Sequence, residues 1–327
     1  MRRATVPRFW VLRGAVRIGI LGAGGISDTH ARAAQGIAGV EVVAVHGANR
    51  EKAAALARAS GATVYDDLHQ FLAHPMDIVA IGSPSGVHAA QAIPAVRRGL
   101  HVLVEKPLDT TTAKIDELIA EADRSRAKVG VFFQDRLTPD LVEMKREVDE
   151  GRLGDPVIIS GRVKWYRPPE YYGTSRWRGT WQFDGGGALM NQAIHTVDLM
   201  LWLFGPVTRV SGRVATRLHK IEVEDTAAAV FEFANGAIGV IEASTAAFPG
   251  LPRRVEVTGT KGTVVHEQDA RPAIVADATP HRRVLEDFIS AIRNNGTPAC
   301  DAREGRRSVA LVQAVYESAR SGGPVTL

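Results

Sequence analysis

Residues 16–27 read VRIGILGAGGIS, in which an apolar, β-rich run leads directly into a glycine-rich turn. The turn opens a stretch of helical composition, so the segment has the strand, turn, helix order of a dinucleotide site. Glycines at such a turn let a pyrophosphate approach the free N–H groups at the helix N-terminus. Ser27 occupies the third glycine position of the motif, so a glycine turn without a ligand is the alternative. The residues expected to contact the cofactor here are Gly22, Gly24, Gly25 and Ile26.

Short β-rich runs alternate with helical stretches through the first half of the chain. The strand candidates are VRIGIL at 16–21, VEVVAV at 40–45, DIVAIG at 77–82, HVLVEK at 101–106 and KVGVFF at 128–133. Between the last two runs, apolar residues at 115, 118, 119 and 122 recur at the spacing of one helix face. This pattern predicts an α/β, doubly wound parallel sheet covered by helices, in a dinucleotide-binding domain at 16–137.

The pattern changes after Thr138 and Pro139, which have the character of an N-cap and first residue of a helix ending near Gly151. Six extended runs follow, and Asn235-Gly236 between two of them is typical of a tight hairpin. Thr260-Lys261-Gly262 joins another pair. We therefore expect an α+β domain with an antiparallel sheet at 138–327, closed by helices near 281–294 and 303–321. The runs are VIISGRVKWY, TRVSGRVATR, TAAAVFEF, AIGVIEAS, RRVEVTG and GTVVHEQ.

The composition is that of a folded protein of two domains. The 327 residues exceed one ordinary hydrophobic core, and 45% apolar with 23% charged residues match globular averages. No apolar run approaches the ~18 residues of a membrane span. We expect a cytoplasmic protein with no membrane partner. The single cysteine, Cys300, excludes an internal disulfide and a multi-thiolate metal site.

The basic pI of 9.3 has its origin at the N-terminus. Five arginines precede the first acidic residue, and without them the net charge changes from +4 to −1. The remaining chain has no basic excess to bind a phosphate backbone, which argues against a nucleic-acid partner. Residues 1–15 are expected to form a flexible arm. The five arginines are Arg2, Arg3, Arg8, Arg13 and Arg17.

The end of the second predicted strand bears on the choice of cofactor. An Asp or Glu there binds the ribose 2′-OH of NAD, but residues 46–50 read HGANR and no acid precedes Glu51. An NADP 2′-phosphate is tolerated, and Arg50 can bind it. The alternative is that Arg50 lies on the solvated first turn of the next helix. We expect an NAD(P) cofactor, with a leaning to NADP, contacted by Gly47, Asn49 and Arg50.

Two further loops lie at the carboxyl ends of predicted strands, where parallel sheets form their ligand crevice. The first follows Gly82 and is expected to contact the cofactor through Ser83, Pro84, Ser85 and His88. His88 is alternatively a packing residue at a helix start. The second loop holds Glu105 and Lys106, which are also expected to contact the cofactor; elsewhere a Glu-Lys pair in a loop is usually a surface feature. At this edge Lys106 can donate a hydrogen bond to the oxygen of a reacting alcohol or carbonyl.

Residues 185–205, GGGALMNQAIHTVDLMLWLFG, have helical length but contain no Lys, Arg or Glu. Such a helix is buried nearly all round. Asn191, His195 and Asp198 share one stripe, which favours a face toward a cavity over a solvated polar face. His195 is the natural proton acceptor, and Asn191 and Asp198 are expected substrate contacts. A metal site at His195 and Asp198 would lack a visible third ligand, so we expect no metal.

The chain resembles the glucose-fructose oxidoreductase, inositol dehydrogenase and MocA (Gfo/Idh/MocA) family of NAD(P)-dependent dehydrogenases over 16–327. The resemblance rests on GILGAGGIS, SPSGVH at 83–88, EKPL at 105–108, DGGGALMNQAIHTVDL at 184–199 and VYESARSG at 315–322. It implies a Rossmann domain followed by an open-faced antiparallel sheet that commonly forms homodimer or homotetramer contacts. Lys106 matches the family's catalytic lysine and His195 its catalytic histidine. Asn191 stands where the family often has Asp, as in members that are similar to sugar and sugar-nucleotide dehydrogenases.

The resemblance implies hydride transfer between NAD(P) and a secondary alcohol of a sugar, sugar derivative or cyclitol. A non-catalytic NAD(P)-binding sensor on the same fold is the alternative, which retention of Lys106 and His195 disfavours. Residues 162–182 hold five basic residues against one acid, interleaved with aromatic rings. Aromatic faces pack on sugar rings and Arg binds carboxylate or phosphate, so we expect an anionic sugar. An oligomer interface is the alternative. The expected contacts are Arg162, Tyr172, Trp177 and Arg178, and Arg167 lies in the same segment.

Overall fold

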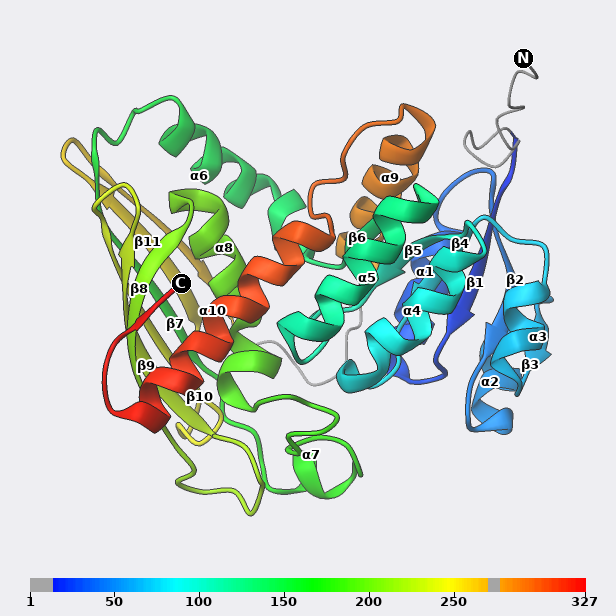
Figure 1. Cartoon of the computed structure of the whole chain (residues 1–327), viewed down its shortest axis with the longest axis horizontal. Coiled ribbons are helices and arrows are strands. Elements are labelled where there is room, and N and C mark those ends of the chain that lie inside the picture. Colours follow the sequence, from blue (N-terminus) through cyan, green and yellow to red (C-terminus); the bar gives the residue numbers. More distant parts are fainter. Residues whose placement is uncertain (1–13, 270–276) are drawn as a thin grey trace.

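A computed structural model describes residues 14–269 and 277–327 of the chain (Figure 1). The first half forms a six-stranded parallel sheet with the strand order β3-β2-β1-β4-β5-β6. The five predicted strands are confirmed, and the short β3 was missed. The arm expected at 1–15 lies, apart from its last two residues, outside the described part. The strands are β1 (Val16–Leu21), β2 (Val40–His46), β3 (Thr63–Tyr65), β4 (Ile78–Ile81), β5 (His101–Val104) and β6 (Val129–Val131).

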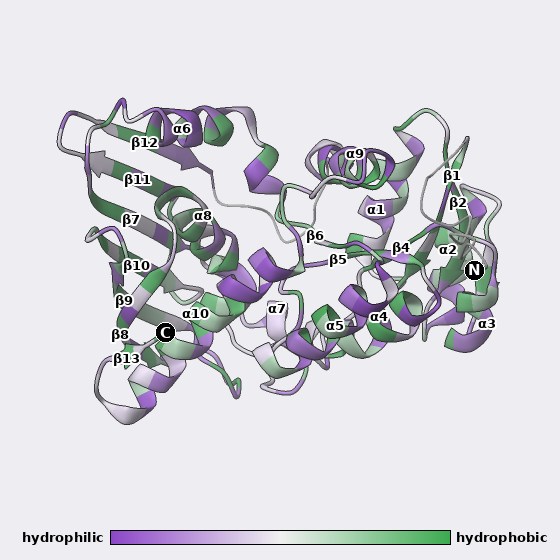
Figure 2. Ribbon diagram, turned by 45° about the horizontal axis from the view of Figure 1, so that its top comes forward, coloured by the Kyte–Doolittle hydropathy of each residue, from purple (hydrophilic) through white to green (hydrophobic). Residues whose placement is uncertain are grey.

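Helices cover both faces of this sheet, because its central strands are apolar on both sides. In β4, Val79 and Ile81 pack toward α4 and α5, whereas Ile78 and Ala80 pack toward α1 and α9. Figure 2 shows α9 beside α1, across the sheet from α4 and α5. Helix α9, although it lies late in the chain, therefore packs on the first sheet beside α1. The helices are α1 (Gly25–Gln35), α2 (Arg50–Arg58), α3 (Leu68–Ala73), α4 (His88–Arg97), α5 (Thr112–Ser125) and α9 (Thr279–Arg293).

The second sheet has seven strands in the order β12-β11-β7-β10-β9-β8-β13. Neighbouring strands pair antiparallel, except for β7 and β10, which are parallel. The sheet, which was expected to be antiparallel, is therefore a mixed sheet with one parallel pair. Parallel neighbours need a long connection, and helical segments and two strands lie between these two. The hairpins at Asn235-Gly236 and at 260–262 are confirmed. The strands are β7 (Pro156–Lys164), β8 (Val207–Ala215), β9 (Thr226–Phe233), β10 (Ile238–Ser244), β11 (Arg253–Gly259), β12 (Thr263–Gln268) and β13 (Val325–Thr326).

Helices cover only one face of the second sheet (Figure 1). A Cβ on Gly161 in β7 would lie 2.6 Å from Thr196 Cγ2, so α8 packs closely against this strand. On the opposite, open face, Lys164 pairs with Glu242. The helices predicted from Pro139 to near Gly151 and near 281–294 and 303–321 are confirmed, although the Thr138 side chain makes no capping hydrogen bond. The helices of the second domain are α6 (Pro139–Asp149), α7 (Glu170–Gly173), α8 (Ile194–Phe204) and α10 (Ala302–Ser321).

The apolar stretch at 185–205 is not one regular helix. A π-helical turn at Ala188–Ala193 leads into α8, which ends before Gly205 with φ +87°. Because a π-helical turn adds a residue, Asn191 does not continue the α-helical stripe of His195 and Asp198. Among the described residues, no helix is long and apolar enough to cross a membrane.

Candidate active site

The glycine turn after β1 leaves room at the start of α1. Gly22 has φ +123°, and a Cβ there would lie 2.7 Å from the Gly82 carbonyl oxygen. Gly24 and Gly25 are exposed, with no atom within 4 Å of a Cβ position, and no side chain caps the helix. Partly exposed Ile26 follows them. Uncapped N–H groups beside open space fit the pyrophosphate of a dinucleotide.

The loop after β2 packs on this turn. A Cβ on Gly47 would lie 2.6 Å from Ala23 Cβ, so only glycine fits there. Asn49 Oδ1 caps α2 by accepting the Lys52 N–H at 3.0 Å. The Arg50 side chain is 82% exposed, and its nearest acid is Asp66 at 3.5 Å. Arg50 is therefore a solvated first-turn residue that remains accessible to a ligand.

The loop after β4 contacts both the loop after β5 and the second domain. The His88 ring is buried, with its nitrogens 2.8 Å from the Pro107 oxygen and 2.9 Å from the Ser83 oxygen. The packing alternative for His88 therefore fits the structure better than cofactor contact. The Gly86 N–H donates to the Phe183 oxygen at 2.8 Å. Around them, Ser83 Oγ donates to Gln91, Pro84 is partly exposed and Ser85 is buried.

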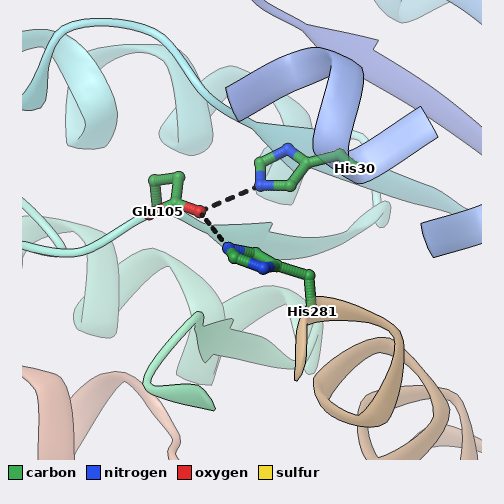
Figure 3. A group of neighbouring side chains, drawn as sticks. All are labelled: His30, Glu105 and His281. Atoms are coloured by element: carbon green, nitrogen blue, oxygen red, sulfur yellow. Dashed lines mark hydrogen bonds and ion pairs between the residues drawn. The ribbon is translucent and has the colours of Figure 1, made fainter. Parts of the chain in front are cut away.

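Glu105 turns its carboxylate into the protein, toward two histidines (Figure 3). Its Oε1 lies 3.0 Å from His30 Nε2 and 3.4 Å from His281 Nε2. The Lys106 N–H donates to Oε2 at 3.2 Å. Burial alone would raise the pKa of Glu105, but hydrogen bonds from His281 and His30 hold it well below its usual range. The carboxylate expected at the cofactor instead anchors the loop that carries Lys106.

The His30, Glu105 and His281 ligand atoms lie within 4.8 Å of one another, a separation that also suits a metal ion. Metal binding through both Nε2 atoms would place both imidazole protons on Nδ1. Neither Nδ1 has a hydrogen-bond partner in the described part of the chain. With the protons on Nε2, both rings instead donate to Glu105. The donor set therefore fits a hydrogen-bonded carboxylate better than a metal centre.

Lys106 reaches the π-helical turn of the second domain. Its Nζ is partly buried and donates to the Asn191 backbone oxygen at 2.9 Å. The Asn191 side-chain amide donates to Asp184 and accepts from Gln192 Nε2 at 2.8 Å. Burial raises the pKa of Asp184 to about 6, against the opposing effects of Gly179, Asn191 and Lys106. The structure thus brings Lys106 and Asn191 together and adds Asp184, which the sequence reasoning did not assign.

His195 is buried at the start of α8, against Phe133 in edge-to-face contact at 5.5 Å. Its Nδ1 lies 3.9 Å from Asp135 Oδ2. Asp135 is itself buried and paired with buried Arg253. A carboxylate at this position can orient the imidazole. Asp135 follows β6 at the carboxyl edge of the first sheet, a position that could have identified it from the sequence.

Two expected substrate residues lie apart from Lys106. Both carboxylate oxygens of Asp198 pair with Arg136 at 2.8 Å, and Ser308 Oγ donates to one of them at 3.1 Å. Asp198 is fully buried and has no room to receive a substrate hydroxyl. Arg162 lies on the open face of the second sheet, 3.8 Å from Glu267. Neither residue enters the function proposed below.

The basic and aromatic segment at 162–182 places other residues than Arg162 near the Asn191 turn. Buried Arg167 donates to Gln192 Oε1 at 3.0 Å, and Tyr171 accepts from Gln192 Nε2 at 2.9 Å. The Arg178 guanidinium lies 4.4 Å from the Tyr171 ring centroid and 5.5 Å from that of Trp177. Sequence reasoning assigned no role to Gln192, whereas Tyr171 belongs to the aromatic segment that was expected to pack on a sugar. Tyr172 is buried and bonds Thr245 at 2.9 Å, so it supports the second domain.

Family models match nearly the whole described chain. Residues 16–133 match the NAD-binding Rossmann fold of the GFO/IDH/MocA oxidoreductase family. Residues 141–265 match a GFO/IDH/MocA C-terminal domain, and residues 275–327 match the C-terminal alpha/beta domain of the oxidoreductase family. The matches therefore cover both sheets and the closing helices.

Individual relatives resemble the chain over its length. The WlbA dehydrogenase of Bordetella pertussis, solved with NADH and UDP-GlcNAcA, has a TM-score of 0.90 and 34% identity, over 97% of this chain and 99% of that one. The WlbA dehydrogenase of Chromobacterium violaceum, solved with the same ligands, has a TM-score of 0.90 and 33% identity, over 99% of both chains. An inositol 2-dehydrogenase of Rhizobium meliloti is 28% identical over 93% of this chain and 96% of its own length.

Proposed function

Since the chain belongs to the GFO/IDH/MocA family of oxidoreductases, we propose that it transfers a hydride between NAD(P) and a secondary alcohol of an anionic, nucleotide-linked sugar. The coarser activity, an NAD(P)-dependent dehydrogenase of CH–OH groups on sugars or cyclitols, follows from the family and its named members. The observation that carries the proposal is the contact of Lys106 with the turn that precedes His195. A cation and an imidazole thereby lie beside the edge that holds the glycine turn.

In this proposal the turn at Gly24 and Gly25 holds the pyrophosphate, and the bound dinucleotide supplies the ring that exchanges a hydride. His195 takes the hydroxyl proton on Nε2, because its Nδ1 faces Asp135. Lys106 donates a hydrogen bond to the same substrate oxygen and stabilises the negative charge that develops there. Assistance by a general acid or base typically gives about 10²- to 10⁴-fold.

The substrate class rests on the residues around Gln192. Arg167 and Arg178 offer planar donors for a carboxylate or phosphate, and Tyr171 and Trp177 offer ring faces. The two WlbA relatives were solved with UDP-GlcNAcA, a ligand that combines a nucleotide with a sugar acid. This agreement supports an anionic substrate over a neutral cyclitol. A role of the same residues in an oligomer interface is the competing proposal.

Two further parts of the proposal concern cofactor choice and assembly. NAD(H) fits the family, and we propose that NADP is accepted at least as well, because residues 46–50 contain no acid and Arg50 is exposed. The open face of the second sheet exposes Val230, Ile238 and Val265, which suits contact between copies in a homodimer or homotetramer. We place the domain boundary between residues 137 and 138.

The test is a substrate screen followed by the absorbance of NAD(P)H. UDP-GlcNAcA, UDP-GlcNAc, a free uronic acid and myo-inositol are each offered with NAD and with NADP. The expected result is turnover of UDP-GlcNAcA that exceeds turnover of UDP-GlcNAc, which lacks the sugar carboxylate, and turnover of the neutral cyclitol myo-inositol. Turnover of none of them, together with NAD(P)H binding by fluorescence, would instead favour a non-catalytic sensor.

A further inference from the structure

Asp184 is a buried carboxylate beside Lys106 that the mechanism above does not use. It is 1% exposed and lies immediately before the glycine run of the second domain. One oxygen accepts the Gly179 N–H at 2.8 Å, and the other accepts the Asn191 side-chain amide. The backbone oxygen of the same Asn191 accepts the Lys106 ammonium at 2.9 Å. A single residue thus joins the carboxylate to the lysine.

The position of Asp184 is fixed from the first domain as well. The Gly86 N–H donates to the Phe183 oxygen, and a Cβ on Gly86 would lie 2.1 Å from the Gln182 oxygen. The chain just before Asp184 is therefore held against the loop after β4. A movement of Asp184 relative to Lys106 would require this close backbone contact to break.

Charged and titratable groups face Asp184 from several elements. Lys106 lies after β5, and Arg178 lies in the loop between α7 and Asp184; both favour its charged form. Tyr172 from α7 and Tyr316 from α10 also interact with it. The neighbouring carboxylate of Glu224 has other hydrogen-bond partners, since it accepts two backbone N–H groups and the Tyr316 hydroxyl. Asp184 is therefore the carboxylate placed to balance the lysine.

We propose that Asp184 is a positioning residue for Lys106, which fixes the Asn191 turn that holds the ammonium and supplies the negative charge that keeps it protonated. The role in catalysis rests on the proposed dehydrogenase function, whereas the electrostatic role does not. A nearby carboxylate favours the charged form of a lysine. Because burial raises the pKa of Asp184 to about 6, this charge is present at neutral pH and disappears on acidification.

The first experiment needs no substrate. Lys106 in the intact protein is acylated with a dilute reagent over a pH series, and its modification is followed by mass spectrometry. Only the neutral amine reacts, so Asp184→Asn is expected to make Lys106 reactive at lower pH than in the wild type. Glu222→Gln, which removes an exposed carboxylate that accepts the Trp181 N–H, is the matched control and leaves the profile unchanged.

A second variant separates charge from structure. The double variant Asp184→Asn, Asn191→Asp exchanges the carboxylate and the amide that share this hydrogen bond. The negative charge is thereby kept at the turn, and we expect the wild-type acylation profile to return. If the proposed activity is found, kcat falls roughly 10- to 100-fold in Asp184→Asn. The alkaline limb of its pH profile moves to lower pH, and the double variant reverses both changes.

Each outcome bears on the proposal. An unchanged acylation profile in Asp184→Asn overturns it, as does a double variant that shifts like the single one, because both results leave only a structural role. Absence of dehydrogenase activity in the wild type would contradict the proposed function but leave the acylation result valid. The two failures are therefore distinguishable.

Discussion

The Nδ1 atom of His195 lies 3.9 Å from Oδ2 of Asp135, and both side chains are buried. At this separation the two atoms make no direct hydrogen bond, but a carboxylate favours a proton on the ring nitrogen that faces it. Arg253 pairs with the same carboxylate, which holds Asp135 in place. His195 therefore has a defined orientation before a substrate binds, which gives a first prediction about turnover.

Asp135→Asn is expected to lower kcat by about 10-fold or more with a small change in KM, since it weakens an interaction that grows as His195 gains a proton. Steady-state kinetics against the preferred sugar check this. Asp140→Asn, at the exposed start of α6, is the control. Because the variant leaves buried Arg253 without its carboxylate, the melting temperature is measured in parallel. A kcat equal to that of the control would remove Asp135 from the mechanism.

Lys106→Ala is expected to lower kcat by at least ~10²-fold, because the substrate oxygen loses its cationic donor. The Lys106 ammonium donates to the Asn191 backbone oxygen, whereas the glycine turn that is proposed to hold the pyrophosphate follows a different strand, β1. NAD(P)H binding, measured by fluorescence titration, should therefore stay within a few-fold of wild type. An enzyme that retains full turnover without this lysine would show that another group holds the oxygen.

Acidification should destabilise the protein through the buried histidine cluster. Burial lowers the pKa of His30 below 6.5 although Glu105 opposes the effect, so the unfolded chain binds a proton at this site before the folded protein does. The stability from neutral His30 is complete above pH 6.5 and falls as pH drops below it. The depressed pKa of Glu105 adds a further loss below pH 4.5.

Melting temperatures between pH 8 and pH 5 test the histidine effect. The fall toward pH 5 should be smaller in His30→Asn, which removes the titrating ring, than in wild type. His69→Asn, on the exposed surface of α3, should keep the wild-type slope. Equal slopes in all three proteins would mean that His30 does not contribute to this pH dependence.

Arg50→Ala is expected to raise KM for NADP several-fold and to leave KM for NAD unchanged, because only NADP carries a phosphate at the ribose 2′ position. The exposed Arg50 side chain contacts only one acid, the exposed Asp66, in the described part of the chain, so its loss should not affect folding. Arg58→Ala at the other end of α2 controls for a general loss of positive charge. Strict NAD dependence in the wild type, with no measurable NADP binding, would contradict the premise.

Five strands of the first sheet were predictable because each is a mostly apolar, β-rich run that ends at the ligand edge. β3 was not, since its three residues are partly or fully exposed and carry no apolar pattern. The π-helical turn was also not predictable, because a segment that is apolar all round shows no periodic alternation of apolar and polar residues. The pairing of Asp198 with Arg136 joins elements 62 residues apart, which no local spacing reveals.

The position of Arg162 on the open face of the second sheet, by contrast, could have been predicted from the sequence. In β7, Ile159, Gly161 and Val163 alternate with Ser160, Arg162 and Lys164, and the apolar set faces the helices. A period of two therefore places Arg162 on the opposite face. Asp184 was not predictable as a partner of Asn191, since the turn through three glycines between them sets their contact.

Arg178→Ala tests the anionic substrate, because Arg178 lies beside Tyr171 and Trp177 and interacts with Asp184 near Lys106. A desolvated Arg contact to a carboxylate or phosphate contributes about 1.5–3 kcal/mol. We therefore expect kcat/KM for UDP-GlcNAcA to fall by about 10- to 100-fold, whereas kcat/KM for a neutral sugar changes little. Arg176→Ala, which removes an exposed arginine close to Arg178 in the sequence, is the matched control. Equal loss on charged and neutral sugars, or a change of mass in solution with unchanged KM, would favour the oligomer interface instead.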